Sequence, residues 1–364
     1  MFKNYIRIGA FICASVCIPM VAGEIEKTAD KMSLGEPFWS SKTMVNEPVL
    51  FVQAKDAPVA TGKLLFTPSG KLKITHPDLM MVYEDGKDYI WKPETGTIEL
   101  TPTSRIPFKT SAQLTPGGGP NTLTGVLWSE GHFFHDLQVQ VTYEHTDEFA
   151  WKPTPSPHPL MRSLAKLKSH QPFKLVAMGD SITEGFNASG FKEVWAPPYQ
   201  PNYAQLVANT LQKRFGTTVI LVNFGVRGTQ ANLGFTQLDR LKTEKPDLIT
   251  VAFGMNHGES ASAFEETNRK LLAAIQATVP EADVVLVAPM TQRLPADKFC
   301  GYRDVLSKMV KANVALADVT TPWIEVLKKK SFSDISGNNF NHPNDFGHRL
   351  YAQVICQLFT LEIK

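Results

Sequence analysis

The chain has 364 residues, which is enough for two domains. Hydrophobic residues make up 43% and charged residues 20%, a composition of ordinary globular proteins that excludes a disordered or fibrous chain. The 37 lysines and arginines nearly balance the 35 acidic residues, so the charge does not indicate a nucleic-acid-binding protein.

Residues 1–23 differ in character from the rest of the chain. Lys3 and Arg7 give a basic start, residues 8–21 form an almost uncharged run, and residues 21–23 are small. Because the run is short for a membrane span, we predict a secretory signal peptide over residues 1–23, with a retained anchor as the alternative. Its removal would leave 37 − 2 = 35 basic and 35 acidic residues. The protein would then be secreted or periplasmic, with no membrane attachment after cleavage.

Residues 24–150 have the pattern of a β-rich domain. Short apolar runs alternate with turn signals such as Asp85-Gly86, and residues 137–143 alternate apolar and polar side chains. We therefore predict an antiparallel β-sandwich-like domain here. Its aromatic residues are expected to fill the core, with stacking against sugars as the alternative. These residues are Trp39, Tyr83, Tyr89, Trp91 and Trp128.

Residues 151–171 are predicted to link two domains. Prolines at alternate positions from 153 to 159 keep the chain extended. A short basic helical turn is expected at residues 162–169. Two cysteines remain beyond the signal peptide, Cys300 and Cys356, and they could pair in an oxidising compartment or stay free.

Residues 172–364 alternate strand and helix patterns. This order predicts an α/β domain, a doubly wound parallel sheet flanked by helices. The expected strands cover residues 175–178, 218–222, 247–253, 283–288 and 314–319. The expected helices cover residues 202–215, 231–242, 260–278, 302–314 and 343–359.

Ser181 lies where the first of these strands ends and a helix is expected to begin. In α/β sheets this is the edge at which ligands bind, and the N–H groups of a helix N-terminus favour negative charge. Both features suit a nucleophile that must also hold an oxyanion. The alternative is that Ser181 only caps the helix.

The stretch Gly179–Gly185, of sequence GDSITEG, resembles the first block of the SGNH (GDSL) hydrolases. Three further stretches resemble the remaining blocks in the same order, namely residues 223–228, 254–257 and 342–343. The resemblance covers residues 172–364 and implies a flavodoxin-like hydrolase domain. Some secreted carbohydrate acetylesterases of this family carry an N-terminal β-domain, an arrangement similar to the one predicted here.

The resemblance also assigns roles to residues. It implies that Ser181 is the nucleophile and that His342 is its general base. The oxyanion would be held by the N–H groups of Ser181 and Gly228 and by the side-chain amide of Asn256. Gly225 is the less favoured alternative to Gly228.

The chain departs from the family pattern three residues before the histidine. The family usually has an aspartate there, and this chain has Asn339. We predict that the Asn339 oxygen accepts the Nδ1–H of His342 and orients the ring without charging it. The alternatives are a different carboxylate, Asp318 or Asp345, or a backbone carbonyl near Phe340.

These features together predict a secreted serine esterase. We expect it to remove O-acetyl groups from a carbohydrate or polysaccharide through an acyl-enzyme. The alternatives are a short-chain esterase or lysophospholipase, and a carbohydrate-binding protein with a weak hydrolase domain. Residues 186–201 hold no long apolar lid but carry Trp195 and Tyr199.

The expected partner is an ester substrate, either a small molecule or a polysaccharide, and not a nucleic acid. We expect no cofactor and no metal, because the sequence contains no cluster with metal-ligand spacing. The sequence leaves open the identity of the sugar and the oligomeric state.

Overall fold

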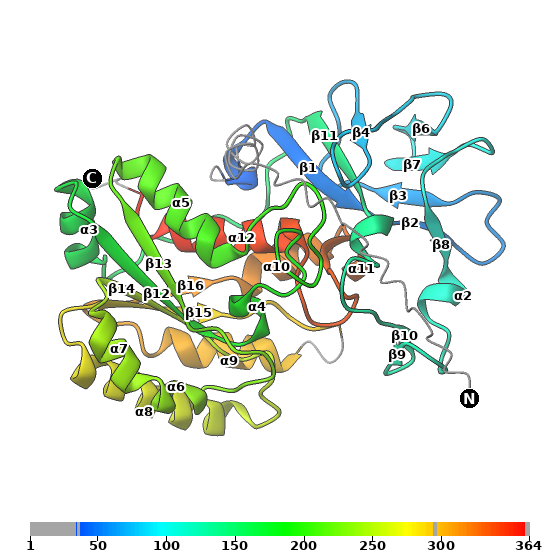
Figure 1. Ribbon diagram of the computed structural model, residues 1–364. Helices are drawn as coiled ribbons and strands as arrows, with labels where there is room; N and C mark the ends of the chain where they lie inside the picture. The colour runs from blue at the N-terminus through cyan, green and yellow to red at the C-terminus, as the bar shows by residue number, and fades with distance from the viewer. Residues whose placement is uncertain (1–33, 35–36, 294–296, 361–364) are drawn as a thin grey trace, which may run out of the picture.

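The computed structural model describes residue 34, residues 37–293 and residues 297–360. The predicted signal peptide, residues 1–23, lies outside these ranges. The described chain forms two regions that lie side by side (Figure 1). One is built on a parallel sheet, and the other is rich in short strands. Among the described residues, no helix combines the length and the apolar character needed to cross a membrane.

The parallel sheet has five strands in the order β13-β12-β14-β15-β16. Their bounds are β12 (Phe173–Gly179), β13 (Val219–Asn223), β14 (Leu248–Ala252), β15 (Asp283–Ala288) and β16 (Val314–Asp318). Strand β12 lies between β13 and β14, with Val176 opposite both Val222 and Ile249. The strand order therefore reverses at β12, and such a switch point is where α/β sheets place their binding sites.

Helices cover both faces of this sheet (Figure 1). On one face lie α5 (Tyr203–Phe215) and α12 (Asp345–Gln357), and α3 (Met161–Lys168) packs on α5. The other face carries α7 (Leu238–Glu244), α8 (Ala261–Thr278) and α9 (Asp297–Ser307). Four further helices complete the region, namely α4 (Ser181–Glu184), α6 (Leu233–Thr236), α10 (Thr320–Leu327) and α11 (Phe332–Ile335). The predicted doubly wound α/β sheet is confirmed.

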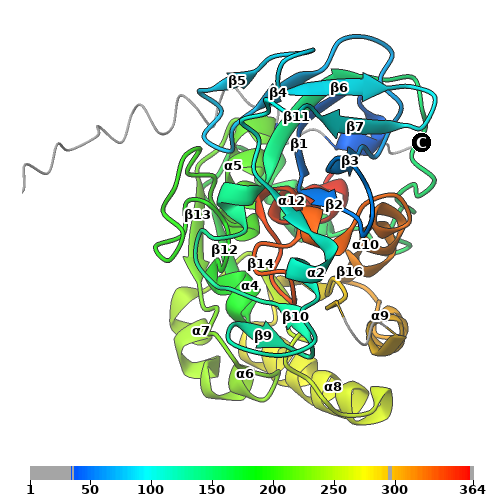
Figure 2. The ribbon, with the colours of Figure 1, turned by 90° about the vertical axis from the view of Figure 1, so that its right-hand side faces the viewer.

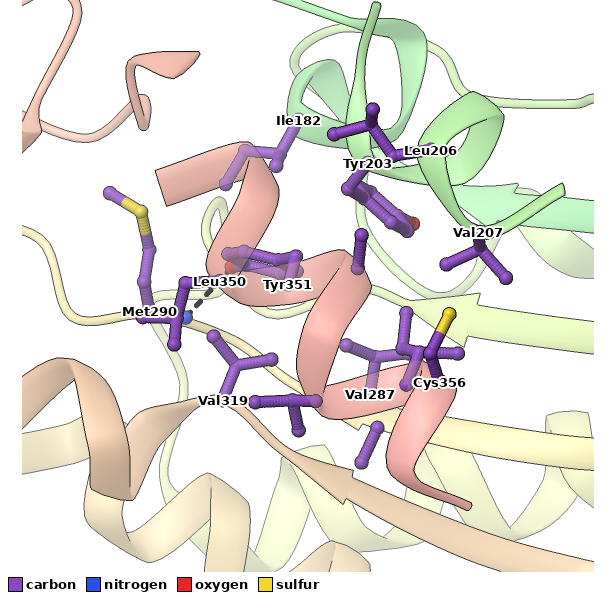
Figure 3. Close-up of a cluster of buried hydrophobic side chains, with 14 of the residues drawn as sticks. Ile182, Tyr203, Leu206, Val207, Val287, Met290, Val319, Leu350, Tyr351 and Cys356 are labelled. Atoms are coloured by element: carbon purple, nitrogen blue, oxygen red, sulfur yellow. Dashed lines mark hydrogen bonds between the residues drawn. The ribbon is translucent and has the colours of Figure 1, made fainter. Parts of the chain in front are cut away.

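Helix α12 shows how the sheet and helices share a core (Figure 3). Its Leu350, Tyr351 and Cys356 are buried among side chains of the sheet and of α5. The buried hydroxyl of Tyr351 accepts a hydrogen bond from the N–H of Met290, with N···O 2.8 Å. Burial raises the pKa of the Cys356 thiol to about 12. Cys356 and Cys300 are both free cysteines in this structure.

Most predicted elements of this region lie within a few residues of the observed ones. Helix α5 starts after Asn202, whose side chain accepts the N–H of Gln205, and it ends at Gly216 with φ 61°. The expected helix 231–242 is divided into α6 and α7, and Gln237 at the junction donates its amide to the carbonyl of Phe224. The expected helix 302–314 starts earlier and ends earlier, as α9. Helix α10 has no counterpart in the prediction.

The N-terminal region consists of two main sheets. One is antiparallel, in the order β1-β11-β4-β5, and the other has the order β6-β7-β3-β2-β8. Within the second sheet β2 pairs with β8 in parallel, which the prediction of antiparallel strands did not include. The strands are β1 (Thr43–Val49), β2 (Phe51–Gln53), β3 (Thr61–Lys63), β4 (Lys73–Thr75), β5 (Val82–Tyr83), β6 (Tyr89–Lys92), β7 (Thr97–Leu100), β8 (Phe108–Thr110) and β11 (Val139–Glu144).

A small hairpin lies outside these two sheets. It is formed by β9 (Thr122–Leu123) and β10 (Val126–Leu127), and three short helices lie in the same region. These are η1 (Phe38–Ser40), α2 (Ser111–Leu114) and η2 (His135–Leu137). Figures 1 and 2 both place the hairpin away from the two sheets. Leu127 of β10 accepts a hydrogen bond from Asn339, which lies between α11 and α12. The β-rich region therefore extends to the carboxyl edge of the parallel sheet.

The aromatic residues of the β-rich region mostly fill its core, as expected. Tyr83 and Tyr89 are buried. Trp39 and Trp91 are partly buried and pack against the same hydrophobic cluster. Trp128, just after β10, is half-buried.

The two regions meet through polar contacts as well as a shared hydrophobic cluster. Glu47 of β1 and Lys330 form an ion pair with N···O 2.8 Å, and each side chain is only 1% exposed. The N–H of Leu50 donates to a carboxylate oxygen of Asp334 at 2.8 Å. Arg349 of α12 donates to two backbone carbonyls of β1. We call this set of contacts the interface between the regions.

Candidate active site

Ser181 and His342 lie in contact, although 161 residues separate them in the chain. The hydroxyl oxygen of Ser181 is 2.9 Å from Nε2 of His342. Both residues are nearly buried, with 4% and 6% of their surfaces exposed. At this distance Nε2 can accept the hydroxyl proton, which is the step that activates a serine nucleophile.

Local structure fixes the position of Ser181. Strand β12 is buried along its length and ends at Gly179, and Ser181 is the first residue of α4. The helix is capped by Asp180, whose carboxylate accepts the N–H of Ile182 at 3.0 Å. Burial raises the pKa of Asp180 to about 6. The strand and the cap thus fix Ser181 at the carboxyl end of β12, the strand at which the order of the sheet reverses.

The residues predicted to hold an oxyanion follow the three adjacent strands β12, β13 and β14. Gly228 is exposed on the loop after β13, with φ 70°. Asn256 follows β14, and its Nδ2 donates to the carbonyl of Thr229 at 3.0 Å. That hydrogen bond connects the loop of Asn256 to the loop of Gly228, and it uses one of the two amide hydrogens of Asn256. The other hydrogen remains for a substrate oxygen.

The structure distinguishes Gly228 from the alternative, Gly225. The N–H of Gly225 donates to the side chain of Asn223 at 2.8 Å, so it is already used. A Cβ at Gly225 would lie 2.3 Å from the backbone nitrogen of Glu184, so a glycine is required there for close packing. Among the hydrogen bonds of the described residues, none uses the N–H of Gly228. Gly228 is therefore the better candidate for an oxyanion donor.

His342 lies in a tightly bonded loop between α11 and α12. The Oδ1 atom of Asn338 accepts three backbone N–H groups, those of Phe340, Asn341 and His342, each at 3.0 Å. The hydroxyl of Ser336 donates to the carbonyl of His342 at 2.8 Å. This network fixes the loop before any substrate binds.

Three side chains surround Nδ1 of His342. The Oδ1 of Asn187 lies 2.9 Å away. The two carboxylate oxygens of Glu130 lie at 3.2 and 3.3 Å. The Nδ2 of Asn338 lies at 3.1 Å. An amide oxygen and a carboxylate therefore both stand where the Nδ1–H of the neutral ring can donate.

The prediction that Asn339 orients His342 is wrong in this structure. Oδ1 of Asn339 accepts hydrogen bonds from Arg293 and from Ser333, and its Nδ2 donates to the carbonyl of Leu127 at 2.8 Å. The physical reason is that these hydrogen bonds already use both polar atoms of the Asn339 side chain. Asn339 therefore binds the β-rich region instead of the histidine ring.

The alternative carboxylates also bind elsewhere. Asp318 accepts the N–H and the hydroxyl of Thr321, in the first turn of α10. Asp345 accepts the N–H of Ser189 at 2.7 Å, and burial raises the pKa of its carboxyl. The backbone alternative finds no support either, because the contacts that Nδ1 of His342 makes within the described residues are all with side chains.

Sequence reasoning did not identify Glu130 or Asn187. Glu130 lies 212 residues before His342, in the loop that follows β10. Its neighbours in sequence, Ser129 and Gly131, carry no motif, so only the folded chain shows its position. Asn187 could have been suspected, because it follows the Ser181 block by a few residues. It has φ 61°, a conformation that asparagine tolerates better than most residues.

The pKa of the Glu130 carboxyl is lowered in this setting. Burial alone would raise its pKa, but the hydrogen bond and positive charge of His342, together with the amide of Asn338, hold the pKa below its usual range. The amide of Asn338 donates to Glu130 at 2.9 Å. The site thus has a negative charge close to the ring that must become positive when it takes the serine proton.

A polar rim flanks the Ser181–His342 pair. The ring of Phe186 is 5.2 Å from the ring of His342, and the guanidinium of Arg227 lies over Phe186 at 4.4 Å. Arg227 pairs with Glu184 at 2.9 Å and with Glu193 at 3.0 Å. Beyond them Trp195 is 59% exposed. Its ring lies 5.1 Å from that of Tyr199.

No group of three or more histidine, cysteine or acidic side chains that could hold a metal ion occurs in the part of the chain that the structure describes. The serine and histidine already supply a nucleophile and a base. The arrangement can therefore attack a carbonyl carbon and hold the resulting oxyanion with groups of the chain itself.

A model of a known protein family matches the part of the chain that contains this site. The model of the GDSL-like lipase/acylhydrolase family matches residues 177–350, which include Ser181, Gly228, Asn256 and His342. No curated protein matches the chain.

Solved structures similar to this chain include esterases. A two-domain esterase active on acetylated mannans has 22% sequence identity and a TM-score of 0.47, and the match covers 56% of this chain and 53% of that one. An acetylxylan esterase from Geobacillus stearothermophilus has 20% identity and a TM-score of 0.44, with 52% of this chain and 95% of that chain covered. The chain thus matches about half the length of the mannan esterase.

Proposed function

Residues 177–350 form a GDSL-like lipase/acylhydrolase family domain, and from this premise we propose that the protein is a serine esterase that removes O-acetyl groups from a carbohydrate. The observation that carries the proposal is the 2.9 Å contact between the Ser181 hydroxyl and Nε2 of His342 at the start of α4. In a carbohydrate-binding protein with an inactive hydrolase domain, function would not require this contact or the oxyanion donors.

The proposed reaction has two steps. His342 takes the proton of Ser181 as the oxygen attacks the ester carbonyl, and the oxyanion is held by the N–H groups of Ser181 and Gly228 and by the amide of Asn256. His342 then gives the proton to the sugar oxygen as the bond between that oxygen and the carbonyl carbon breaks, so that the sugar alcohol departs and an acetyl-serine remains. Water, activated by the same histidine, releases acetate and restores the serine.

The rim of the site supports a sugar as the alcohol part of the ester. Arg227, Glu184 and Glu193 are charged and partly exposed, which suits a substrate rich in hydroxyl groups better than a long hydrocarbon chain. The exposed indole of Trp195 offers an apolar face on which a sugar ring can stack. The short-chain esterase remains a second candidate, because the same serine and histidine would serve it.

We also propose that the protein acts outside the cytoplasm. The support is the sequence of residues 1–23, which has the basic start, apolar run and small-residue end of a signal peptide. A polymeric substrate outside the cell would be consistent with this location. Sequencing the N-terminus of the protein recovered from the medium or periplasm tests this, and a start at or near residue 24 is expected.

The proposed function is tested by acetate release from a panel of acetylated polysaccharides, measured with the wild type and with Ser181→Ala. Losing the nucleophile should lower kcat by about 10⁶, the scale measured for a serine protease triad. A fluorophosphonate should label Ser181 alone, as mapped by mass spectrometry. Labelling elsewhere, or full activity in Ser181→Ala, would contradict the proposal. A preference for acyl chains longer than acetyl would favour the lipase-type alternative.

A further inference from the structure

The environment of Nδ1 decides how His342 is oriented and charged. When Nε2 accepts the proton of Ser181, Nδ1 already carries a hydrogen, so the ring becomes positive. The groups around Nδ1 must then accept that hydrogen and balance the charge. Asn187 Oδ1 at 2.9 Å and the Glu130 carboxylate at 3.2 Å are both placed to do so.

The hydrogen bonds of the two asparagines fix which of their atoms face the ring. Nδ2 of Asn187 donates to the carbonyls of Gly131 and Gly337, so its oxygen faces Nδ1. Oδ1 of Asn338 accepts three backbone N–H groups, so its NH₂ group faces the ring and Glu130. Asn338 therefore cannot accept from Nδ1, and it serves instead to hold the carboxylate.

Other ionisable groups face His342 without replacing Glu130. Asp180 lies on the Ser181 side of the ring, and its carboxylate accepts the N–H of Ile182. His348 of α12 lies near enough to interact electrostatically, and its Nε2 bonds the carbonyl of Phe186. Across the described ranges, Glu130 supplies the only carboxylate within salt-bridge distance of His342.

Contacts from the parallel-sheet region hold Glu130 in place. Asn339 donates to the carbonyl of Leu127, Asn338 donates to Glu130 itself, and Asn187 donates to the carbonyl of Gly131. Three asparagine side chains thus bind residues 127–131 along their length. Gly337 permits the close packing of Asn187 against residue 337, because a Cβ on residue 337 would lie 2.3 Å from Cβ of Asn187.

We propose that Glu130, a residue of the β-rich region, is the carboxylate that balances the charge of His342, while Asn187 fixes the orientation of the ring. The proposal deepens the proposed esterase function and rests on it. Orientation and charge, which one aspartate provides in a Ser-His-Asp triad, are divided here between two side chains from different regions. The β-rich region thereby completes the active site. Glu130 acts through His342 and does not itself touch the reacting atoms.

The test uses the full chain and measures pH–rate profiles of acetate release for Glu130→Gln, Glu130→Asp and Asn187→Gly. Glu130→Gln keeps the size of the side chain and removes its charge. A nearby opposite charge shifts a titration by about 1 to 3 pH units, so the acid limb should move down by roughly 1 to 2 units. We expect kcat to fall by about 10- to 100-fold, less than the roughly 10⁴ seen when a triad loses its tautomer control, because Asn187 still orients the ring.

The remaining variants separate charge from orientation. Glu130→Asp keeps the charge and should recover most of kcat and the position of the acid limb. Asn187→Gly, which tolerates the positive φ of residue 187, should lower kcat while the acid limb moves little. Glu94→Gln removes one charge from an exposed turn of the same region and should behave as the wild type.

A second readout does not depend on ester hydrolysis. In the Ser181→Ala background, the NMR titration of the ¹⁵N-labelled His342 ring should have a lower midpoint with Glu130→Gln than with Glu130 present. An unchanged pH–rate profile together with an unchanged NMR midpoint in Glu130→Gln would overturn the proposal. A fall in kcat without a shift of the acid limb or of the NMR midpoint would also overturn it, because such a fall would reflect a purely structural role of Glu130. If the wild type releases no acetate, the proposed function fails, and the NMR midpoint still decides the role of Glu130.

Discussion

The β-rich region and the parallel-sheet region position their functional side chains by different means. In the parallel sheet, β12, β14 and β15 are buried along almost their whole length. Strands β12, β13 and β14 each lead into a segment that carries a site residue, namely Ser181, Gly228 or Asn256. In the β-rich region most strands have two to four residues, and the loop that bears Glu130 belongs to neither main sheet. That loop is placed by hydrogen bonds from asparagines of the other region.

The difference shows two ways of positioning a functional side chain. Ser181, Gly228 and Asn256 come to one edge because parallel strands all end there. Glu130 reaches the same place only because the two regions dock. The parallel-sheet region should therefore control the chemical groups of the reaction, while the β-rich region should control charge balance and stability. Three experiments on other residues test this division, and a fourth tests the buried charge of Asp180 within the parallel-sheet region.

The largest effect on activity is expected from Asn256→Ala, which removes a donor that the parallel sheet alone supplies. Loss of one oxyanion donor typically lowers kcat by about 10² to 10³. Substrate binding should change much less, because the oxyanion exists only in the transition state. Asn209→Ala, on the exposed surface of α5, is the control. A raised KM with an unchanged kcat would show that Asn256 acts on binding and not on the oxyanion.

The interface between the regions should matter for stability. Glu47→Gln leaves the buried ammonium of Lys330 with the carbonyl of Lys63 and with Asp334 at 3.9 Å. Breaking a buried ion pair costs about 3 to 5 kcal/mol, and we expect about 3 because Asp334 remains. Urea unfolding measures the change. Glu148→Gln, which removes an exposed partner of Lys152, should leave the unfolding free energy unchanged. An unaltered midpoint in Glu47→Gln would show that the regions do not depend on this pair.

Asp180→Asn should stabilise the protein at neutral pH. Burial raises the pKa of Asp180 from 3.8 to about 6, so between these values the folded state binds more protons than the unfolded state. Stability is therefore lost as pH rises through this window, by about 3 kcal/mol at most for a shift of roughly 2 units. Asparagine keeps the cap of α4 without the buried charge.

Urea unfolding of Asp180→Asn at pH 4 and pH 7.5 checks this sign. The gain in stability over the wild type should be larger at pH 7.5. Asp239→Asn, on the exposed side of α7, should show no such difference. A gain that is the same at both pH values would mean that the charge of Asp180 is not the cause.

The smallest effect is expected from Asn339→Gly. Glycine adopts the positive φ of residue 339 without strain, so the variant mainly loses the bond to Leu127 and those from Arg293 and Ser333. Asn338 and Asn187 still hold Glu130 and its neighbour, so kcat should fall by less than about tenfold, with the acid limb unmoved. A loss near 10⁴ would return Asn339 to the orienting role predicted from its spacing.

Sequence patterns predicted most of the parallel-sheet region. The expected strand 283–288 coincides with β15, and the caps Asn202, Gly216 and Ser260 lie where α5 and α8 begin or end. Local chemistry determines such features, because apolar periodicity and capping act within one or two turns. The patterns were less informative for the β-rich region. The apolar run at residues 63–66 was expected to be a strand, but residues 64–66 lie outside any strand, and no run was assigned to β6, β7 or β8. Strands of so few residues carry too little periodicity to be recognised.

The sequence by itself determined which residues follow the strands of the sheet, and so it was sufficient to bring Ser181, Gly228, Asn256 and His342 to one edge. The tertiary structure decided what faces the other nitrogen of His342. Spacing pointed to Asn339, but hydrogen bonds direct that side chain to Leu127 and leave the ring to Asn187 and Glu130. The physical reason is that strand order follows from local pattern, whereas a contact across 212 residues depends on how two folded surfaces fit together.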